Sequence, residues 1–136
     1  MFSYTYTAFG GQNLWNLQAP DSPLTINDFT TVSISESTAT FSIPKFSATT
    51  TLTGNFSFVG AAPKPNSITG TVLTSSLIKD EVVMDTESWS KGADLQKLFD
   101  YSYTLSLLSG DDYFEGSAAF GGDDSIQGLG GNDRFK

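Results

Sequence analysis

Three short segments near the C-terminal end of the chain share one pattern, and this repetition constrains the fold more than any other feature. Each segment begins with Gly, continues with Asp or Asn and then Asp, and carries a large apolar residue two positions after that Asp. The segments span residues 110–115, 122–127 and 131–136. A repeat of this length predicts short units that stack on one another, because a single unit is too small to bury its own apolar residue.

The residue types of the repeat are those of a loop that binds a hard cation. Glycine allows the loop backbone to adopt positive φ and leaves its carbonyl groups accessible. Carboxylate and carbonyl oxygens are the ligands that calcium prefers, and calcium takes about six to eight of them. The residues predicted to bind calcium are Asp112, Asp124, Asp133, Gly110, Gly122, Gly131, Asp123 and Asn132.

The units resemble the nonapeptide Gly-Gly-x-Gly-x-Asp-x-U-x of RTX, or haemolysin-type calcium-binding, proteins, where U is apolar. The resemblance implies a tight loop and a short strand for each unit, stacked as a right-handed parallel β-roll. It also implies that calcium lies between loops two units apart, which makes Asp112 and Asp133 the pair for a shared ion. The inward apolar residues would be Phe114, Ile126 and Phe135.

The chain departs from this pattern in two places. Residues 107–109 stand where the leading glycines of the first unit belong, and residues 116–118 add three positions between the first two units. The spacing is therefore twelve from Asp112 to Asp124 but nine from Asp124 to Asp133. A weaker resemblance covers residues 50–109, which look like the β-rich region that often precedes RTX repeats.

Composition removes several other classes of site. The chain has no Cys and no His, which excludes disulfides, Ser-His-Asp triads and His-based zinc sites. Residues 1–79 carry three acidic and three basic side chains, so the net charge of −8 lies in residues 80–136. An acidic half argues against nucleic acid and anionic membranes as partners, and no apolar run is long enough to span a membrane.

Before the repeats, the pattern predicts a β-rich region over residues 1–109, followed by the repeat region over 110–136. Residues 2–8 alternate strictly, and residues 50–53 and 56–59 predict two strands joined by a hairpin at Gly54-Asn55. Further strands are expected at 67–78, 81–84 and 105–108. Apolar residues at 95, 98 and 99 predict one short helix near 93–100. The expected fold class is mainly β, ending in a parallel β-roll.

The function expected from these features is a calcium-binding module of a secreted bacterial protein with a structural or adhesive role, and no enzymatic activity. Residues 1–10 do not resemble a Sec signal peptide, which agrees with type I secretion of RTX proteins. An uncovered final repeat predicts end-to-end contact between copies of the chain.

Two alternatives stay open. One is a module of a secreted carbohydrate-active enzyme, with Glu81, Asp85 and Glu87 as the carboxylates. The other is a glycan- or ice-binding surface made of Thr-x-Thr steps, which occur at residues 5–7, 38–40, 49–51, 51–53 and 69–71.

Overall fold

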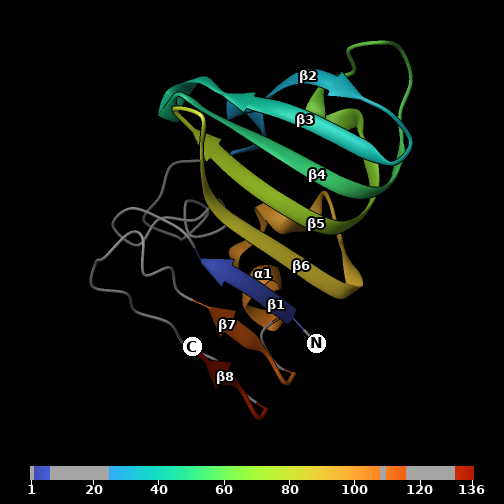
Figure 1. Ribbon diagram of the computed structural model, residues 1–136. Helices are drawn as coiled ribbons and strands as arrows, with labels where there is room; N and C mark the ends of the chain where they lie inside the picture. Colours follow the sequence, from blue (N-terminus) through green and yellow to red (C-terminus); the bar gives the residue numbers. More distant parts are fainter. Residues whose placement is uncertain (1, 7–24, 108–109, 116–130) are drawn as a thin grey trace.

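The computed structural model describes residues 2–6, 25–107, 110–115 and 131–136, which form one eight-stranded sheet (Figure 1). The strands are β1 (Phe2–Tyr6), β2 (Thr30–Ile34), β3 (Thr38–Ile43), β4 (Ala48–Ser57), β5 (Thr69–Lys79), β6 (Val82–Asp94), β7 (Tyr113–Glu115) and β8 (Arg134–Phe135). The helical segments are η2 (Ile26–Asp28), η3 (Pro44–Phe46), η4 (Pro65–Ser67), η5 (Lys97–Phe99) and α1 (Tyr101–Ser106). The prediction of a mainly β fold is confirmed.

The strand order is β2-β3-β4-β5-β6-β1-β7-β8. The strands from β2 to β6 form an antiparallel meander, and β1 adds to β6 in antiparallel orientation. Beyond β1 the orientation changes, because β7 pairs in parallel with β1 and β8 in parallel with β7. The described residues thus end in two parallel strand pairs, and they do not complete a β-roll. Among them, no helix is long and apolar enough to cross a membrane.

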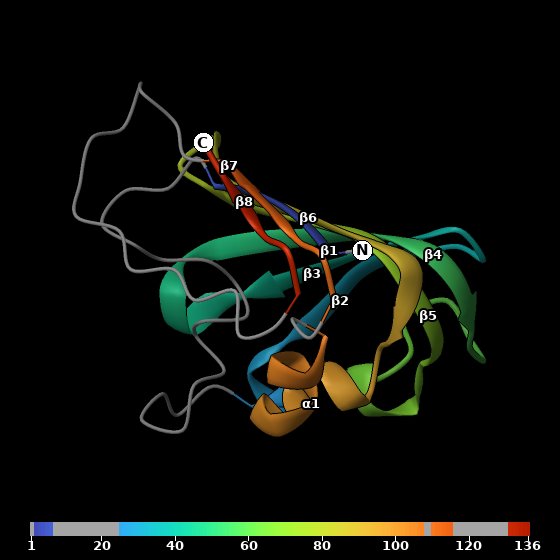
Figure 2. The ribbon, with the colours of Figure 1, turned by 90° about the horizontal axis from the view of Figure 1, so that it is seen from below.

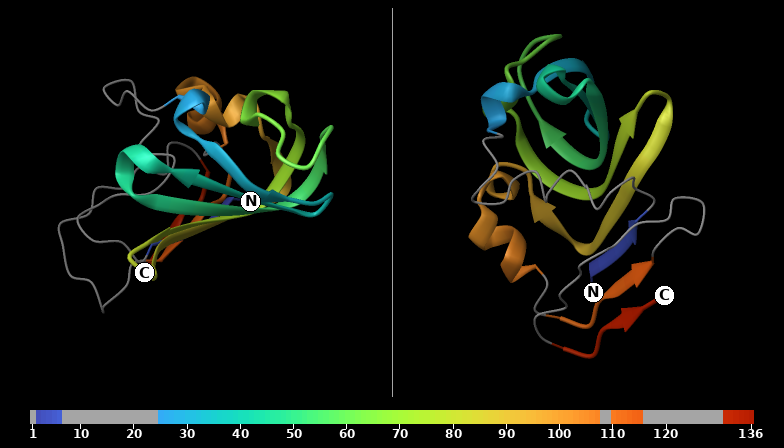
Figure 3. Two further views of the ribbon diagram at one scale, coloured as in Figure 1. Left: turned by 90° about the horizontal axis from the view of Figure 1, so that it is seen from above. Right: turned by 90° about the vertical axis from the view of Figure 1, so that its left-hand side faces the viewer.

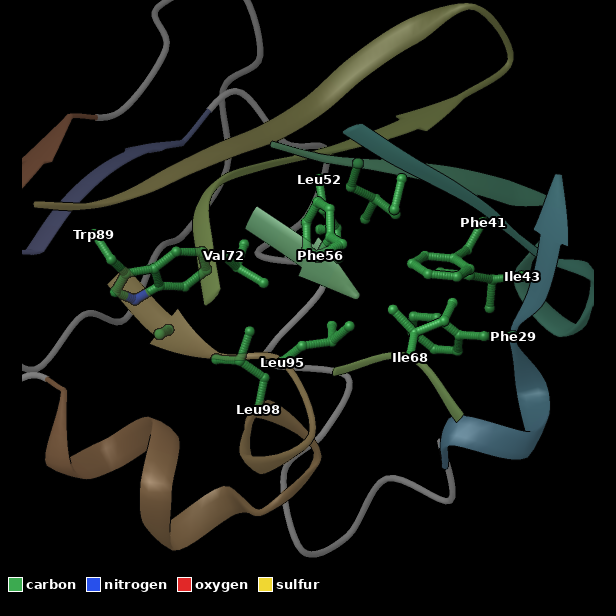
Figure 4. Packing of buried hydrophobic residues seen from close by; sticks show 13 residues of the cluster. Phe29, Phe41, Ile43, Leu52, Phe56, Ile68, Val72, Trp89, Leu95 and Leu98 are labelled. Carbon is green, nitrogen blue, oxygen red and sulfur yellow. The ribbon is translucent and has the colours of Figure 1, made fainter. Parts of the chain in front are cut away.

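One face of the sheet is covered by the helical segments, and the hydrophobic core lies between them (Figure 2). Alternation along β3 buries Ala39, Phe41 and Ile43, as expected for a strand with one face toward the core. Figure 4 shows these side chains meeting Phe29 and Ile68, while Leu95 and Leu98 approach from the segment after β6.

Two glycines on neighbouring strands allow the sheet to bend around this core. A methyl group built on Gly54 of β4 would lie 1.9 Å from the carbonyl oxygen of Thr71, and one on Gly70 of β5 would lie 2.0 Å from that of Asn55. The β4–β5 register shifts between Thr53 and Gly54. Glycine within a strand commonly marks such a bulge or a close backbone approach.

The hairpin predicted at Gly54-Asn55 is therefore wrong. Strand β4 continues through both residues from Ala48 to Ser57. Gly54 serves the close approach of β5 rather than a chain reversal, and a glycine in the middle of a β-rich run looks the same in either case.

The predicted helix near 93–100 is also misplaced. Strand β6 continues to Asp94, η5 follows at Lys97–Phe99, and the α-helix begins only at Tyr101. The strand ends because Asp94 Oδ1 accepts hydrogen bonds from the backbone N–H groups of Gln96 (3.0 Å) and Lys97 (3.2 Å). The apolar residues that suggested a helix are buried by this turn, with Leu95 and Leu98 both almost fully enclosed.

Helix α1 occupies part of the segment predicted to return to a strand at 105–108, so that prediction is wrong for Leu105. Asp100 starts the helix, because its Oδ1 accepts hydrogen bonds from the hydroxyl (2.6 Å) and the backbone N–H (2.9 Å) of Ser102. The hydrogen bond from the Ser102 hydroxyl, followed by the one from its backbone, lowers the pKa of Asp100. Residues 108 and 109 lie outside the described residues.

The close approach at Gly70 generates a matched test. We expect Gly70→Ala to destabilise the fold by about 3 kcal/mol or more, because the methyl group meets a backbone carbonyl that moves only if the sheet opens. Gly60 also has positive φ, yet a methyl group there meets nothing within 4 Å. Gly60→Ala should therefore cost only about 1–2 kcal/mol in urea denaturation. Equal losses for the two variants would show that backbone conformation, not strand contact, explains Gly70.

Candidate metal-binding loops

The first and third sequence repeats lie next to each other at the edge of the sheet. Their strands pair in parallel, with Tyr113 aligned to Arg134 and Phe114 to Phe135. The loops that precede these strands, Gly110–Asp112 and Gly131–Asp133, are therefore adjacent, and we call them the paired loops. Figure 3 shows β1, β7 and β8 running side by side, with the turns before β7 and β8 at the same end. Equivalent positions of the repeat are 21 residues apart.

The paired loops exchange hydrogen bonds between carboxylates and backbone amides. The Asp112 N–H donates to Asp133 Oδ1 at 3.0 Å, and the Asn132 N–H donates to Asp111 Oδ1 at 2.7 Å. A backbone bond from Arg134 N–H to the Asp112 carbonyl, at 2.8 Å, continues the contact into the strands. Each loop thus holds the other in register. Hydrogen bonds to ionised carboxylates are stronger than neutral ones, so three short bonds fix this small contact well.

The backbones of the paired loops approach so closely that one position tolerates only glycine. Gly131 has φ +105°, and a methyl group there would lie 2.3 Å from the Gly110 carbonyl oxygen. Gly110 is different, since a methyl group on it meets nothing within 4 Å. The two glycines of the repeat therefore have unequal roles. Gly131 permits the contact, whereas Gly110 contributes its carbonyl to it.

Burial and charge differ between the acidic residues of the paired loops. Asp112 is only 2% exposed, Asp133 is half-buried, and Asp111 is exposed. Three carboxylates and several loop carbonyls therefore gather within two short segments, with the Arg134 side chain exposed beside them. Oxygens of this kind suit a hard cation such as calcium. Among the described residues, no group of three or more acidic, His or Cys side chains has metal-binding geometry, so a cation here would also need backbone carbonyls.

The structure brings five of the eight predicted calcium ligands together: Gly110, Asp112, Gly131, Asn132 and Asp133. The other three, Gly122, Asp123 and Asp124, lie outside the described residues, as does Ile126. The prediction missed Asp111, whose carboxylate binds the opposite loop. The second position of every unit is Asp or Asn, and this regularity would have identified it.

The carboxylates of the enzyme alternative do not form a pair. Glu81 lies in the exposed turn between β5 and β6, with φ +63°. Glu87 is 3% exposed and aligns with Ser75, which is also buried. Six residues of strand separate the two by roughly 20 Å, which is well beyond the roughly 5–10 Å of a glycosidase pair. The side chain of Asp85 lies outside what the structure describes.

Hydroxyl side chains form two rows across the face of the sheet opposite the core. Thr40, Thr51, Ser76 and Thr86 align in one row, and Thr38, Thr53, Thr74 and Ser88 align in the other. A shallow hollow of about 240 Å³ lies over the centre of these rows. The hydroxyls of Thr53 and Thr74 are hydrogen-bonded to each other, so part of this surface satisfies itself. Such cross-strand pairs stabilise a sheet without any ligand.

Comparison of the chain with protein-family models, with curated proteins and with solved structures finds no match in any of the three.

The unequal glycines of the paired loops give a test of the loop contact. We expect Gly131→Ala to separate β8 from β7, because its methyl group overlaps the Gly110 carbonyl. Amide hydrogen exchange should then lose protection at Asp112 and Arg134, the two donors that cross the contact. Gly110→Ala is the matched control and should leave both amides protected. Full protection in Gly131→Ala would contradict the close approach described here.

Proposed function

We propose that the paired loops bind calcium and form the start of a parallel β-roll in a secreted structural or adhesive protein. The observation that carries this proposal is the side-by-side placement of two Gly-(Asp/Asn)-Asp loops that are 21 residues apart in sequence. This is the arrangement that the RTX resemblance implies for units two apart. Asp112 and Asp133 would provide carboxylate oxygens, and residues around Gly110 and Gly131 would provide carbonyls.

Electrostatics support a cation as the ligand. The paired loops contribute three carboxylates, and the whole net charge of −8 lies in residues 80–136. Carboxylates brought together in one place repel one another unless a cation or hydrogen bonds compensate. The amide donors of Asp112 and Asn132 compensate part of this charge, and calcium would compensate the rest. Sites in extracellular modules bind calcium with Kd of about 10⁻⁴–10⁻³ M, and we expect that range here.

The structural role follows from the division of the chain. The strands from β2 to β6 form a well-packed body around an apolar core, while the acidic residues concentrate toward the tail. The hydroxyl rows leave a second candidate, in which the sheet face binds a neutral hydroxylated ligand such as a glycan. A glycan array separates the two, because glycan binding lost in Thr53→Val/Thr74→Val but kept in Asp133→Asn would favour the sheet face.

Two substitutions at Asp133 distinguish metal binding from hydrogen bonding. Asparagine keeps an oxygen that accepts the Asp112 N–H but removes the charge, whereas alanine removes both. We expect Asp133→Asn to lower the melting temperature in about 5 mM calcium, because a ligand that binds only the folded state stabilises it by mass action. In chelator, Asp133→Asn should melt like the unsubstituted protein, and Asp133→Ala should melt lower.

The contrary pattern is equally clear. If Asp133→Asn loses the same melting temperature in chelator as in calcium, its carboxylate acts through hydrogen bonds, and the metal proposal fails at this residue. Glu36→Gln is the matched control, since Glu36 is an exposed acid far from the paired loops in the strand order. It should leave the calcium-dependent shift unchanged.

Self-association is the remaining part of this proposal. Strand β8 is the last in the order of the described sheet, so its outer edge can pair with another strand. We expect millimolar calcium to promote end-to-end contact between copies through residues 120–136, and chelator to reverse it. Light scattering at high protein concentration measures this, with a version ending at Ser109 as control. A chain that stays monomeric in calcium contradicts it.

A further inference from the structure

Strand β1 is paired along both edges by segments that are distant in sequence. Five residues of β1 align with β6, from Phe2 with Trp89 to Tyr6 with Asp85. On its other edge, Ser3, Tyr4 and Thr5 align with Tyr113, Phe114 and Glu115 of β7. The strand at one end of the chain thus lies between the body of the sheet and the first repeat. Figure 3 shows it in that position, between β6 and the two tail strands.

The paired loops join the sheet through β1. In the strand order of the described residues, β7 neighbours β1 on one side and β8 on the other, and neither β7 nor β8 is hydrogen-bonded to β2–β6. Strands β7 and β8 have only three and two residues. A two-stranded ribbon of this size is not stable in water on its own, and parallel pairing is the less stable kind. The loops therefore need an existing strand edge against which to form.

The antiparallel contact with β6 is longer than the parallel contact with β7, with five aligned pairs against three. Strand β1 is thus held by the body of the sheet, and its other edge is available to the repeat. In this arrangement the position of the Asp112 loop depends on the position of β1, because Asp112 immediately precedes the β7 residue aligned with Ser3. Asp133 depends on β1 in turn, through its bond to the Asp112 amide.

We propose that β1 is the positioning element of the calcium-binding loops, a strand held on β6 that orders β7 and β8 when calcium binds. This inference rests on the proposed function and adds an element that the repeat pattern does not contain. A preorganised site binds more tightly because less ordering opposes binding. The coupling is reciprocal, so calcium also strengthens the pairing of β7 with β1.

Because the chain has no cysteine, pairs of introduced cysteines report each edge of β1 separately. Ser3 is aligned both with Ser88 of β6 and with Tyr113 of β7. Aligned residues on neighbouring strands lie about 5 Å apart, within reach of a short bifunctional thiol reagent. The variants are Ser3→Cys/Tyr113→Cys for the β7 edge and Ser3→Cys/Ser88→Cys for the β6 edge.

We expect the pair at residues 3 and 88 to cross-link at the same rate in calcium and in chelator. The pair at residues 3 and 113 should cross-link at least tenfold faster in calcium. Equal rates for this second pair in the two conditions would overturn the coupling. Loss of the first cross-link in chelator would also overturn it, because β1 would not then be in place before the metal.

The second measurement is the calcium affinity of a version lacking residues 1–6, which we expect to be at least tenfold weaker than that of the intact chain. Circular dichroism and the melting curve in chelator report whether the body still folds. If the intact chain binds calcium and the shortened one binds equally well, the role of β1 is refuted while the proposed function stands. If the intact chain binds no calcium, the proposed function fails and this inference with it. If the shortened version does not fold, the two cross-links still decide.

Discussion

Backbone pairing on both edges of β1 is the interaction on which the arrangement of the tail depends. It joins an antiparallel body to a parallel edge, and it does so with a strand whose two partners lie more than eighty residues further along the chain. Without it, β7 and β8 would be a short parallel ribbon with no neighbour among the described strands. The transition from antiparallel to parallel pairing therefore occurs at β1.

Packing and charge are divided between the two parts of the sheet. The body is stabilised by apolar contacts, such as the edge-to-face pair of Phe29 and Phe99 at 5.1 Å between ring centroids. The paired loops rely on carboxylate–amide bonds and contain little apolar area of their own. A contact of that kind responds to ionic conditions more than a hydrophobic core does, because carboxylate charge is its main component. The proposed calcium site thus lies in the part of the molecule most sensitive to a cation.

Local patterns in the sequence predicted some of this and missed the rest for definite physical reasons. Alternation identified β1 and β3 because each has one face toward the core or its equivalent. Gly54 suggested a turn because a strand bulge and a hairpin use the same residue, and only the position of Thr71 on β5 distinguishes them. The helix near residue 97 was misplaced because Leu95 and Leu98 are buried by a turn of the chain that has nearly helical spacing.

At the site, the repeat spacing predicted that the loops of Asp112 and Asp133 would be neighbours, and the register of β7 and β8 agrees. The bond of Asp111 to the opposite loop, and the dependence of both loops on β1, are long-range features that no local pattern contains.

The central claim is that calcium binds at the paired loops, and an amide NMR titration of the intact chain tests it most directly. The account predicts saturable shifts at Asp112, Asn132 and Arg134, with a Kd of about 10⁻⁴–10⁻³ M for calcium. Magnesium at the same ionic strength should produce much smaller shifts, because it demands a rigid octahedral set of ligands. Unchanged amides at about 10 mM calcium, roughly ten times the upper end of that range, or identical shifts with both ions, would contradict the account.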